Sequence, residues 1–374
     1  MKIKSFIHLT LTSAAVLLIT ACSGGKSEQI VSTVTNPIPV KFGDPFVLAA
    51  SDGKYYMYGT SLSDGFEAYV SEDLSNWQSI GQVYKGGGED QWNLDCFWAP
   101  EVYERSGKYY MFYSSNAKDN PAGDEENFKI GVAVSDSPAG PFTDYLNRPI
   151  FNPPYPIIDA NVLFDDSGKC YLYFSRCCYK HAVDSEIAAK AKEDGFCDEV
   201  EESWVYGVEM LPDFSGVTGE PQLLLAPPTK LDDVQAEWES RSVTNREVNR
   251  RWTEGSYIFK NGDTYYIMYS ANHYGGGYYA VGYATSKSPL GPFEKSSSNP
   301  VLEENVSKGG IVMGTGHNMV VAMPDSTLYC VYHGRMSSNP GERVVFIDKL
   351  NIDNNGILSV DGPTTTPQDI ILSK

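Results

Sequence analysis

The 374-residue sequence is poor in positive charge, because 29 lysines and arginines are outnumbered by 48 aspartates and glutamates and the formal net charge is −19. A nucleic-acid partner requires a basic surface that meets the phosphates, so this balance argues against nucleic-acid binding. The acidic excess is typical of a soluble surface and does not by itself indicate a positively charged partner.

The apolar run near the N-terminus, Leu9 to Thr20, is too short to span a bilayer comfortably. Two lysines precede it, which gives the segment the build of a secretory signal. It ends in Leu18-Ile-Thr-Ala-Cys22, which resembles the bacterial lipoprotein cleavage box. The sequence therefore predicts a signal peptide over residues 1–21 and a lipidated Cys22, with an ordinary signal and a chance cysteine as the alternative.

Residues 22–35 are polar and contain glycine and serine, the composition of a flexible tether. We therefore expect an exported protein, anchored by its lipid to a bacterial membrane on the periplasmic side or at the cell surface. The folded domain is expected over residues 36–374.

Metal-binding side chains are few, with five histidines and seven cysteines in the whole chain. No cysteine pair has metal-ligand spacing backed by histidines, which argues against a zinc site. Export permits disulfides, and Cys177 or Cys178 is placed to pair with Cys197. Cys170 and Cys330 lie in apolar strand patterns, where a small buried thiol is expected.

Aromatic residues and turn formers are abundant, with 25 tyrosines, 34 glycines and 22 prolines. This composition suits many short strands joined by turns and not a helical bundle. One hairpin pattern occurs five times, and its clearest copy is Thr253–Tyr269, where an apolar strand, the dipeptide Asn261-Gly262 and an aromatic strand follow one another. Asn-Gly is a strong hairpin signal, because a type I′ turn needs positive φ at both central residues.

Further strand-like segments follow each hairpin, and the sequence Ser-Pro-x-Gly-Pro-Phe occurs after two of them, at residues 137–142 and 288–293. A unit of about four strands that recurs five times predicts an all-β fold, a five-bladed β-propeller in a single domain.

The five hairpins carry chemically notable residues at one shared position. Twelve residues before the aligned tyrosines Tyr56, Tyr110, Tyr171, Tyr266 and Tyr329 stand Asp44, Trp98, Asp159, Glu254 and His317. Equivalent positions of a ring of hairpins converge on its axis. The sequence therefore predicts one pocket lined by three carboxylates, an indole and an imidazole.

The three carboxylates have apolar or aromatic neighbours, where an unpaired charge is costly, although each one alone has turn capping as an alternative role. Hydrolysis of a glycoside uses two carboxyl groups in different states, because one protonates the departing oxygen while the other takes a proton from water. A third carboxylate raises the pKa of the acid by like-charge repulsion.

As a set, five short motifs resemble those of glycoside hydrolase family 43: Asp44-Pro-Phe46, Trp98-Ala-Pro-Glu101, Ile158-Asp-Ala-Asn161, Thr253-Glu-Gly255 and Gly314-Thr-Gly-His317. The resemblance runs from about Asn36 to the C-terminus and implies a five-bladed propeller and an inverting mechanism. By match of position, Asp44 would be the general base, Glu254 the general acid and Asp159 the residue that tunes the acid. Inversion leaves room for a water molecule, so the acid and base carboxyls are expected roughly 6.5 to 9.5 Å apart.

Three further residues are candidates for contacts with the substrate. Trp98 offers a flat face for a sugar ring, with a place in the core as the alternative. The resemblance places Arg335 near the sugar, with a solvated surface arginine as the alternative. It also implies that His317 lies on the axis beside a structural calcium and its waters, a contact made through water because calcium prefers oxygen ligands. A hydrogen-bonded structural histidine is the alternative for His317, and no cofactor is required.

The third unit is longer than the others and carries an insertion around Cys178–Glu202 and Ala226–Arg251. Residues 232–251 contain few turn formers and are expected to be helical. Because this segment ends just before Glu254, we expect the insertion to shape the mouth of the pocket, with a surface decoration as the alternative.

The sequence thus predicts an inverting glycosidase that removes terminal pentoses, above all α-L-arabinofuranosyl groups, from plant-type polysaccharide or oligosaccharide. A β-xylosidase, an endo-arabinanase or a galactan-acting enzyme of the same family is the alternative within that class. A non-catalytic glycan-binding propeller and a structural propeller are alternatives from other classes, and the three retained carboxylates argue against both.

Overall fold

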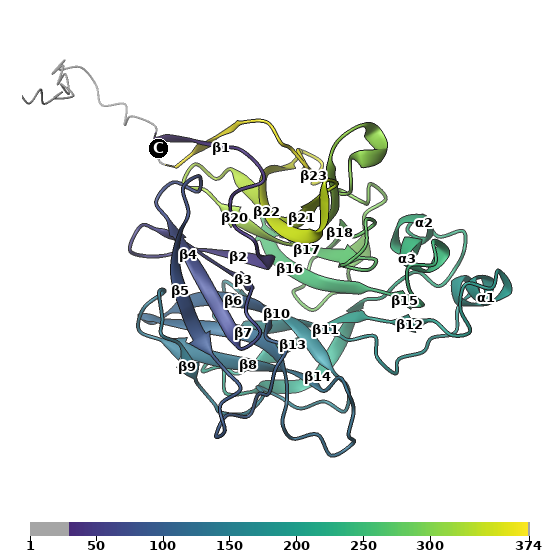
Figure 1. The fold of residues 1–374 in the computed structure, drawn as a ribbon, viewed down its shortest axis with the longest axis horizontal. Coiled ribbons are helices and arrows are strands. Elements are labelled where there is room, and N and C mark those ends of the chain that lie inside the picture. The colour runs from purple at the N-terminus through teal and green to yellow at the C-terminus, as the bar shows by residue number, and fades with distance from the viewer. Residues whose placement is uncertain (1–29, 373–374) are drawn as a thin grey trace, which may run out of the picture.

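The computed structural model describes residues 30–372 (Figure 1). The predicted signal peptide and Cys22 lie outside these residues. Within the described range, no helix is long and apolar enough to cross a membrane.

Five four-stranded antiparallel sheets form the blades of a five-bladed β-propeller, which confirms the predicted fold (Figure 1). Each blade is built from strands that follow one another along the chain. The blades contain, in order, β2 (Gly43–Ala49), β3 (Tyr55–Thr60), β4 (Gly65–Ser71) and β5 (Gln78–Lys85); β6 (Trp98–Arg105), β7 (Lys108–Asn116), β8 (Phe128–Ser135) and β9 (Thr143–Asp144); β10 (Ile157–Phe164), β11 (Cys170–Arg176), β13 (Trp204–Met210) and β14 (Val217–Leu225); β16 (Thr253–Asn261), β17 (Thr264–Ala271), β18 (Ala280–Ser286) and β19 (Glu294–Lys295); and β20 (Val312–Ala322), β21 (Leu328–Met336), β22 (Asn339–Ile352) and β23 (Leu358–Val360).

The core lies between neighbouring blades and is rich in aromatic rings. Tyr84 and Tyr113 are both fully buried, their ring centroids lie 4.9 Å apart, and their hydroxyls are hydrogen-bonded to each other at 2.7 Å. Buried tyrosines are stable in such a core because each hydroxyl finds a partner. The abundance of tyrosine in the sequence is therefore explained by packing between blades.

The first two strands of each blade are the repeated hairpin, but its turn in the fourth blade differs from the prediction. Asn261 pairs with Thr264, so the two central residues are Gly262 and Asp263. Of these only Gly262 has a positive φ, 58°, which is the requirement of a type II′ turn. The expected type I′ turn centred on Asn261-Gly262 is therefore wrong by one residue, because the strand pairing extends to Asn261.

The innermost strand of each blade is irregular at the repeated position. The pairing register shifts between Gly43 and Phe46 in the first blade, and corresponding shifts occur in the other four blades. Asp44, Asp159 and His317 have φ values of 53°, 60° and 48°. Bulges re-aim side chains and are frequent beside active sites. The bulges explain how one sequence offset turns five side chains toward the axis.

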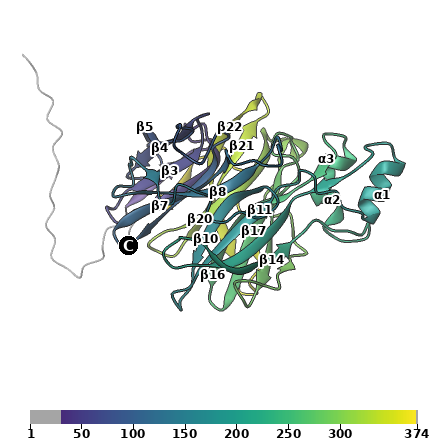
Figure 2. The ribbon, with the colours of Figure 1, turned by 90° about the horizontal axis from the view of Figure 1, so that it is seen from below.

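The insertion of the third blade forms a separate lobe, which lies at one edge of the molecule in two perpendicular views (Figures 1 and 2). It contains α1 (Glu186–Glu193), α2 (Ala236–Glu239), α3 (Arg241–Thr244) and a parallel pair of short strands, β12 (Glu201–Glu202) and β15 (Arg250–Arg251). The predicted helix over residues 232–251 is thus wrong in extent. Buried Arg251 is ion-paired with buried Glu202, and this pair holds the end of the segment in a strand.

The two ends of the described chain pair with each other, through β1 (Val31–Val34) and β24 (Gln368–Ile371). Buried Asn36 also hydrogen-bonds the backbone of Ile347 in both directions, at 2.9 Å each. The predicted boundary at Asn36 is therefore wrong, because residues 31–35 belong to the fold and not to a flexible tether. A short 3₁₀ helix, η1 (Val306–Lys308), completes the elements of the described chain.

The six cysteines of the described chain are free thiols. The expected disulfide between Cys197 and Cys177 or Cys178 is therefore not formed. Cys170 and Cys330 are fully buried in strands, as predicted.

Candidate active site

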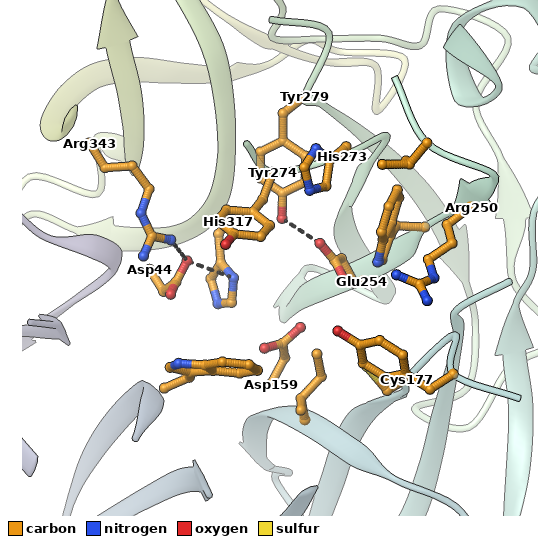
Figure 3. A pocket seen from close by; sticks show the side chains of 15 residues that line it. Asp44, Asp159, Cys177, Arg250, Glu254, His273, Tyr274, Tyr279, His317 and Arg343 are labelled. Atoms are coloured by element: carbon orange, nitrogen blue, oxygen red, sulfur yellow. Dashed lines mark hydrogen bonds and ion pairs between the residues drawn. The ribbon is translucent and has the colours of Figure 1, made fainter. Parts of the chain in front are cut away.

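One pocket of about 200 Å³ lies where the innermost strands meet (Figure 3). All five residues of the repeated position line it, namely Asp44, Trp98, Asp159, Glu254 and His317. The convergence that the repeat predicts is confirmed. The innermost strands of all five blades each supply one of these residues, β2, β6, β10, β16 and β20.

Asp44 is surrounded by positive and hydrogen-donating groups. Arg343 Nη1 lies 3.0 Å from Oδ1 and His317 Nδ1 lies 3.3 Å from it, while the Thr60 hydroxyl donates to Oδ2 at 2.6 Å. Burial alone would raise the pKa of Asp44, but Arg343, His317, His333 and the Thr60 hydroxyl outweigh it and hold the pKa well below its usual range. Asp44 is therefore ionised throughout the neutral range.

Glu254 has the opposite environment. Burial is the largest influence and the Asp159 carboxylate the next, and together they raise the pKa of Glu254 well above its usual range. Among residues 30–372, its carboxyl accepts one hydrogen bond, from the Tyr279 hydroxyl to Oε1 at 3.1 Å. Glu254 therefore retains its proton at pH values where Asp44 is charged.

Asp159 lies between these two environments and connects them. Its Oδ2 accepts hydrogen bonds from the Gly255 backbone at 3.1 Å and from the Ser175 hydroxyl at 3.2 Å. Burial raises the pKa of Asp159, His317 lowers it, and the nearby charge of Asp44 raises it again, with a net upward shift. Because the bond to Gly255 reaches the residue after Glu254, a change at Asp159 acts directly on the neighbourhood of Glu254.

Trp98 and His317 both belong to the pocket wall and are also held by neighbouring residues. Trp98 lines the pocket while its ring packs on Phe128, with centroids 4.5 Å apart. His317 also lines the pocket, and its backbone N–H donates to the Ser270 hydroxyl at 2.8 Å while its ring contacts Asp44. His317 is thus a hydrogen-bonded residue of the pocket wall.

Arg335 does not line the pocket. Its guanidinium donates to the carbonyls of Pro340, at 2.8 Å, and Tyr274, at 3.3 Å. Arg335 therefore supports the loop that carries Tyr274, which does line the pocket. The arginine beside the carboxylates is Arg343, on the next strand of the same blade.

Sequence reasoning missed several residues of the pocket wall. They are Ile158, Cys177, Tyr179, Val248, Arg250, Trp252, His273, Tyr274, Tyr279 and Arg343. Three of them, Tyr179, Val248 and Arg250, lie in the insertion, and the prediction that the insertion shapes the pocket is confirmed. The sequence signal for these three residues was their place in the insertion, whereas Arg343 on β22 carries no such signal.

Glu101 is a buried carboxyl that lies outside the pocket wall. It accepts hydrogen bonds from Asn161 Nδ2, at 2.9 Å, and from the Tyr103 hydroxyl. Burial raises the pKa of Glu101 to about 8. Glu101 thus links the second blade to the third and makes no contact with the pocket.

Among residues 30–372, no group of three or more histidine, cysteine, aspartate or glutamate side chains is arranged to hold a metal ion. His317 Nδ1 is already directed at Asp44. Because calcium requires several oxygen ligands, the side chains around His317 do not form a calcium site by themselves.

The family model for glycosyl hydrolases family 43 matches residues 34–358. The chain belongs to glycosyl hydrolase family 43. This family-43 protein is therefore a glycosidase, which hydrolyses O-glycosyl bonds.

Curated and solved relatives agree with the assignment to family 43. A β-D-galactofuranosidase of Aspergillus niger is 24% identical, with 95% of each chain covered. A xylosidase/arabinosidase of Bacteroides ovatus is 28% identical, with 83% of this chain and 92% of the relative covered. The crystal structure of a thermostable family-43 glycoside hydrolase superimposes with a TM-score of 0.75 at 33% identity, with 91% of this chain and 99% of the other covered. The names of these relatives span several sugars, so membership of family 43 does not by itself fix the substrate.

Proposed function

We propose that this family-43 glycosidase releases terminal pentose residues, above all α-L-arabinofuranosyl groups, from plant-type polysaccharide with inversion of the anomeric carbon. In this proposal Asp44 is the general base, Glu254 the general acid and Asp159 the residue that tunes the acid. The observation that carries it is a single pocket in which one carboxyl is held ionised and another is held protonated.

The proposed reaction uses this difference in charge directly. Asp44 takes a proton from a water molecule, and the water oxygen forms a bond to the anomeric carbon as the glycosidic bond breaks. Glu254 gives its proton to the departing oxygen, which leaves as a hydroxyl. Asp159 keeps the proton on Glu254 until that moment, because its own charge disfavours a second carboxylate nearby.

The size of the pocket favours release of a terminal residue over cleavage within a chain. Its volume of about 200 Å³ is below the roughly 300 to 1,000 Å³ of sites that enclose drug-sized ligands. Such a volume suits one sugar ring, and Trp98 supplies an apolar face for it. The names of the relatives include arabinosidase, xylosidase and galactofuranosidase activities, so an arabinofuranoside, a xyloside and a galactofuranoside are the substrates to compare.

A non-catalytic glycan-binding propeller is the second candidate class. Sugar capture alone needs no carboxyl held protonated beside one held ionised, and the retained pair therefore favours an enzyme. Measured turnover on any glycoside decides between the two.

The test of the proposal is how the turnover rate of the Glu254→Gln variant depends on the leaving group of the substrate. With a poor leaving group such as another sugar, we expect the turnover rate to fall by roughly 10²- to 10⁴-fold, the size of general acid catalysis. With a dinitrophenyl leaving group, which needs no proton, we expect a loss of less than about tenfold. Steady-state kinetics on matched glycosides of the three sugars measure both values.

The control for this variant is Glu237→Gln, which changes an exposed carboxyl of the insertion lobe. It should leave both rates unchanged. An equal loss on both leaving groups in Glu254→Gln would contradict its assignment as the acid.

We also propose lipid attachment at Cys22, motivated by the cleavage-box sequence before it. A Cys22→Ser variant expressed in a bacterial host should move from the membrane fraction to the soluble fraction, and an unchanged distribution would contradict the anchor.

A structural calcium near His317 remains a separate proposal, and no step of the reaction depends on it. If the ion is present and structural, dialysis against EDTA should lower the melting temperature and added calcium should restore it. An unchanged melting temperature would remove calcium from the account.

A further inference from the structure

The insertion of the third blade supplies the wall of the pocket next to Glu254. Arg250 lies on the opposite side of Glu254 from Asp44 and Arg343 in the close view (Figure 3). Tyr179 and Val248 of the same insertion also line the pocket. In an inverting reaction the water and the departing group lie on opposite faces of the sugar ring. The wall beyond the acid is therefore the wall that faces the departing group.

Arg250 is held in one orientation, and part of its guanidinium is available to donate hydrogen bonds to a ligand. Its Nε donates to Glu201 Oε2 at 2.7 Å, and its guanidinium lies 4.7 Å from the centroid of the Tyr179 ring. Within residues 30–372, its two terminal nitrogens donate no hydrogen bond. A guanidinium presents paired N–H donors in a rigid fork, so Arg250 offers an oriented pair of donors at the pocket wall.

The support behind Arg250 is connected twice to the rest of the insertion. Glu201 Oε1 accepts the Lys180 backbone N–H at 2.9 Å, so both of its oxygens are engaged. The next residue on each strand belongs to the fully buried Glu202–Arg251 ion pair. Because its supports are fixed, Arg250 loses little freedom when a ligand binds.

The second half of the insertion also positions the neighbouring loop of the pocket. The Ser242 backbone donates to Asn272 Oδ1 at 3.0 Å, and the Ser242 hydroxyl accepts the His273 N–H at 2.6 Å. The ring of His273 then packs on Trp252, with centroids 5.1 Å apart. The wall beyond Glu254 is thus one connected structure.

We propose that Arg250 and Tyr179 form the binding site for the sugar on the departing side of the bond, and that Arg250 determines specificity by donating to the oxygens of that sugar. The inference rests on the proposed function, since it requires cleavage of a bond between two sugars. The charge of Arg250 is already balanced by Glu201, and the protein as a whole carries −19. The occupant is therefore a neutral, hydroxyl-bearing sugar ring and not a uronic acid.

The test compares Arg250→Met with a matched control, Arg246→Met. Arg246 belongs to the same insertion and also lies over an aromatic ring, with 4.8 Å to the centroid of Phe196, but it does not line the pocket. For Arg250→Met we expect kcat/KM on a neutral disaccharide or trisaccharide to fall about 10- to 100-fold, the loss of one or two hydrogen bonds to a charged donor. On the dinitrophenyl glycoside of the same terminal sugar we expect a change of less than about threefold. Arg246→Met should change neither value.

A binding measurement separates this inference from the rate of the chemical step. In the Glu254→Gln background, we expect calorimetry to show that Arg250→Met lowers the affinity for the oligosaccharide by about 10- to 100-fold. The affinity for the terminal monosaccharide should fall by less than about twofold. An equal loss of affinity for both ligands, or a loss for neither, would overturn the assignment. A wild-type preference for an acidic departing sugar that Arg250→Met abolishes would overturn the choice of a neutral one. Failure of the proposed function is distinguishable, because the wild type would then cleave no glycoside at all.

Discussion

The environments of Asp44 and Glu254 separate their charges although the two residues line one pocket. Asp44 gains from an arginine, a histidine and a hydroxyl within 3.3 Å, whereas Glu254 has one neutral donor, Tyr279, at 3.1 Å. Burial disfavours the charge on both, so the partners decide the outcome. If the hydrogen-bonding and charged partners of the two carboxyls were exchanged, Glu254 would be the ionised group and Asp44 the protonated one.

The pH dependence of the reaction follows from the raised pKa of Glu254. In the proposed mechanism the active form has Glu254 protonated, so activity should persist below that pKa and be lost as the pH rises through it. The Asp159 charge raises the pKa of Glu254. In Asp159→Asn we therefore expect the alkaline limb of kcat/KM to move to lower pH, along with a loss of rate.

A variant of Tyr279 should have the opposite effect. The hydrogen bond from its hydroxyl lowers the pKa of Glu254, so Tyr279→Phe should move the alkaline limb to higher pH. Profiles recorded on one glycoside with a poor leaving group, such as a disaccharide, with both variants beside the wild type, give the comparison. Shifts of the same sign in both variants would contradict the assignment of this limb to Glu254.

The residues of the hairpins were predictable and those of the outer strands were not. Asp44, Asp159 and Glu254 share an offset because each stands at the same bulge of an equivalent strand. Arg343 lies on β22, outside the repeated hairpin. Its guanidinium has room beside Asp44 because residue 43 is glycine. A Cβ at Gly43 would collide with the Arg343 guanidinium. This contact joins the first blade to the fifth, so no local sequence pattern indicates it.

At the scale of the strand, the bulge of β16 positions Glu254, the proposed general acid. Gly255 has a φ of 56°, and an added Cβ would lie 3.0 Å from His317 Nδ1. Its N–H also donates to Asp159. Only glycine adopts this backbone conformation at low cost while leaving room for the imidazole.

Gly255→Ala should lower both stability and activity. The positive φ costs an alanine about 1–2 kcal/mol, and displacement of His317 or Asp159 should lower kcat at least about tenfold, since small misplacements in a site reduce rates strongly. Urea unfolding and steady-state kinetics measure the two effects.

Gly262→Ala is the matched control for Gly255→Ala. Gly262 has a φ of 58° in the hairpin turn of the same strand pair, and no atom lies within 4 Å of the position that an added Cβ would take. The Gly262→Ala variant should lose similar stability while keeping its kcat. A full loss of activity in Gly262→Ala, or none in Gly255→Ala, would contradict the role given to the bulge.

Elements were predicted well where the side-chain pattern alone determines them. The aromatic strands follow from their period, but the turn at Gly262 is shifted by one residue because strand pairing continues through Asn261. The segment before Glu254 is not one helix, because the Arg251–Glu202 ion pair draws its end into the β12–β15 ribbon. Both errors come from contacts between distant segments.

At the scale of the whole molecule, the ring of blades brings distant residues together. The number of blades and the position of the insertion were readable from five copies of one hairpin, since repetition is visible in the sequence. The pairing of β1 with β24 was not readable, because it joins the two ends of the described residues through only four residue pairs. The same ring places the groups proposed as base and acid on different blades, the first and the fourth.

The stereochemistry of the product tests this arrangement most directly. Proton NMR during hydrolysis of an aryl glycoside identifies the first anomer formed, before mutarotation mixes the two. The account predicts the inverted anomer, β-arabinofuranose from an α-L-arabinofuranoside, with turnover abolished in Asp44→Asn while sugar binding is kept. A first-formed product that retains the anomeric configuration would contradict activation of water by Asp44, and with it the proposed mechanism.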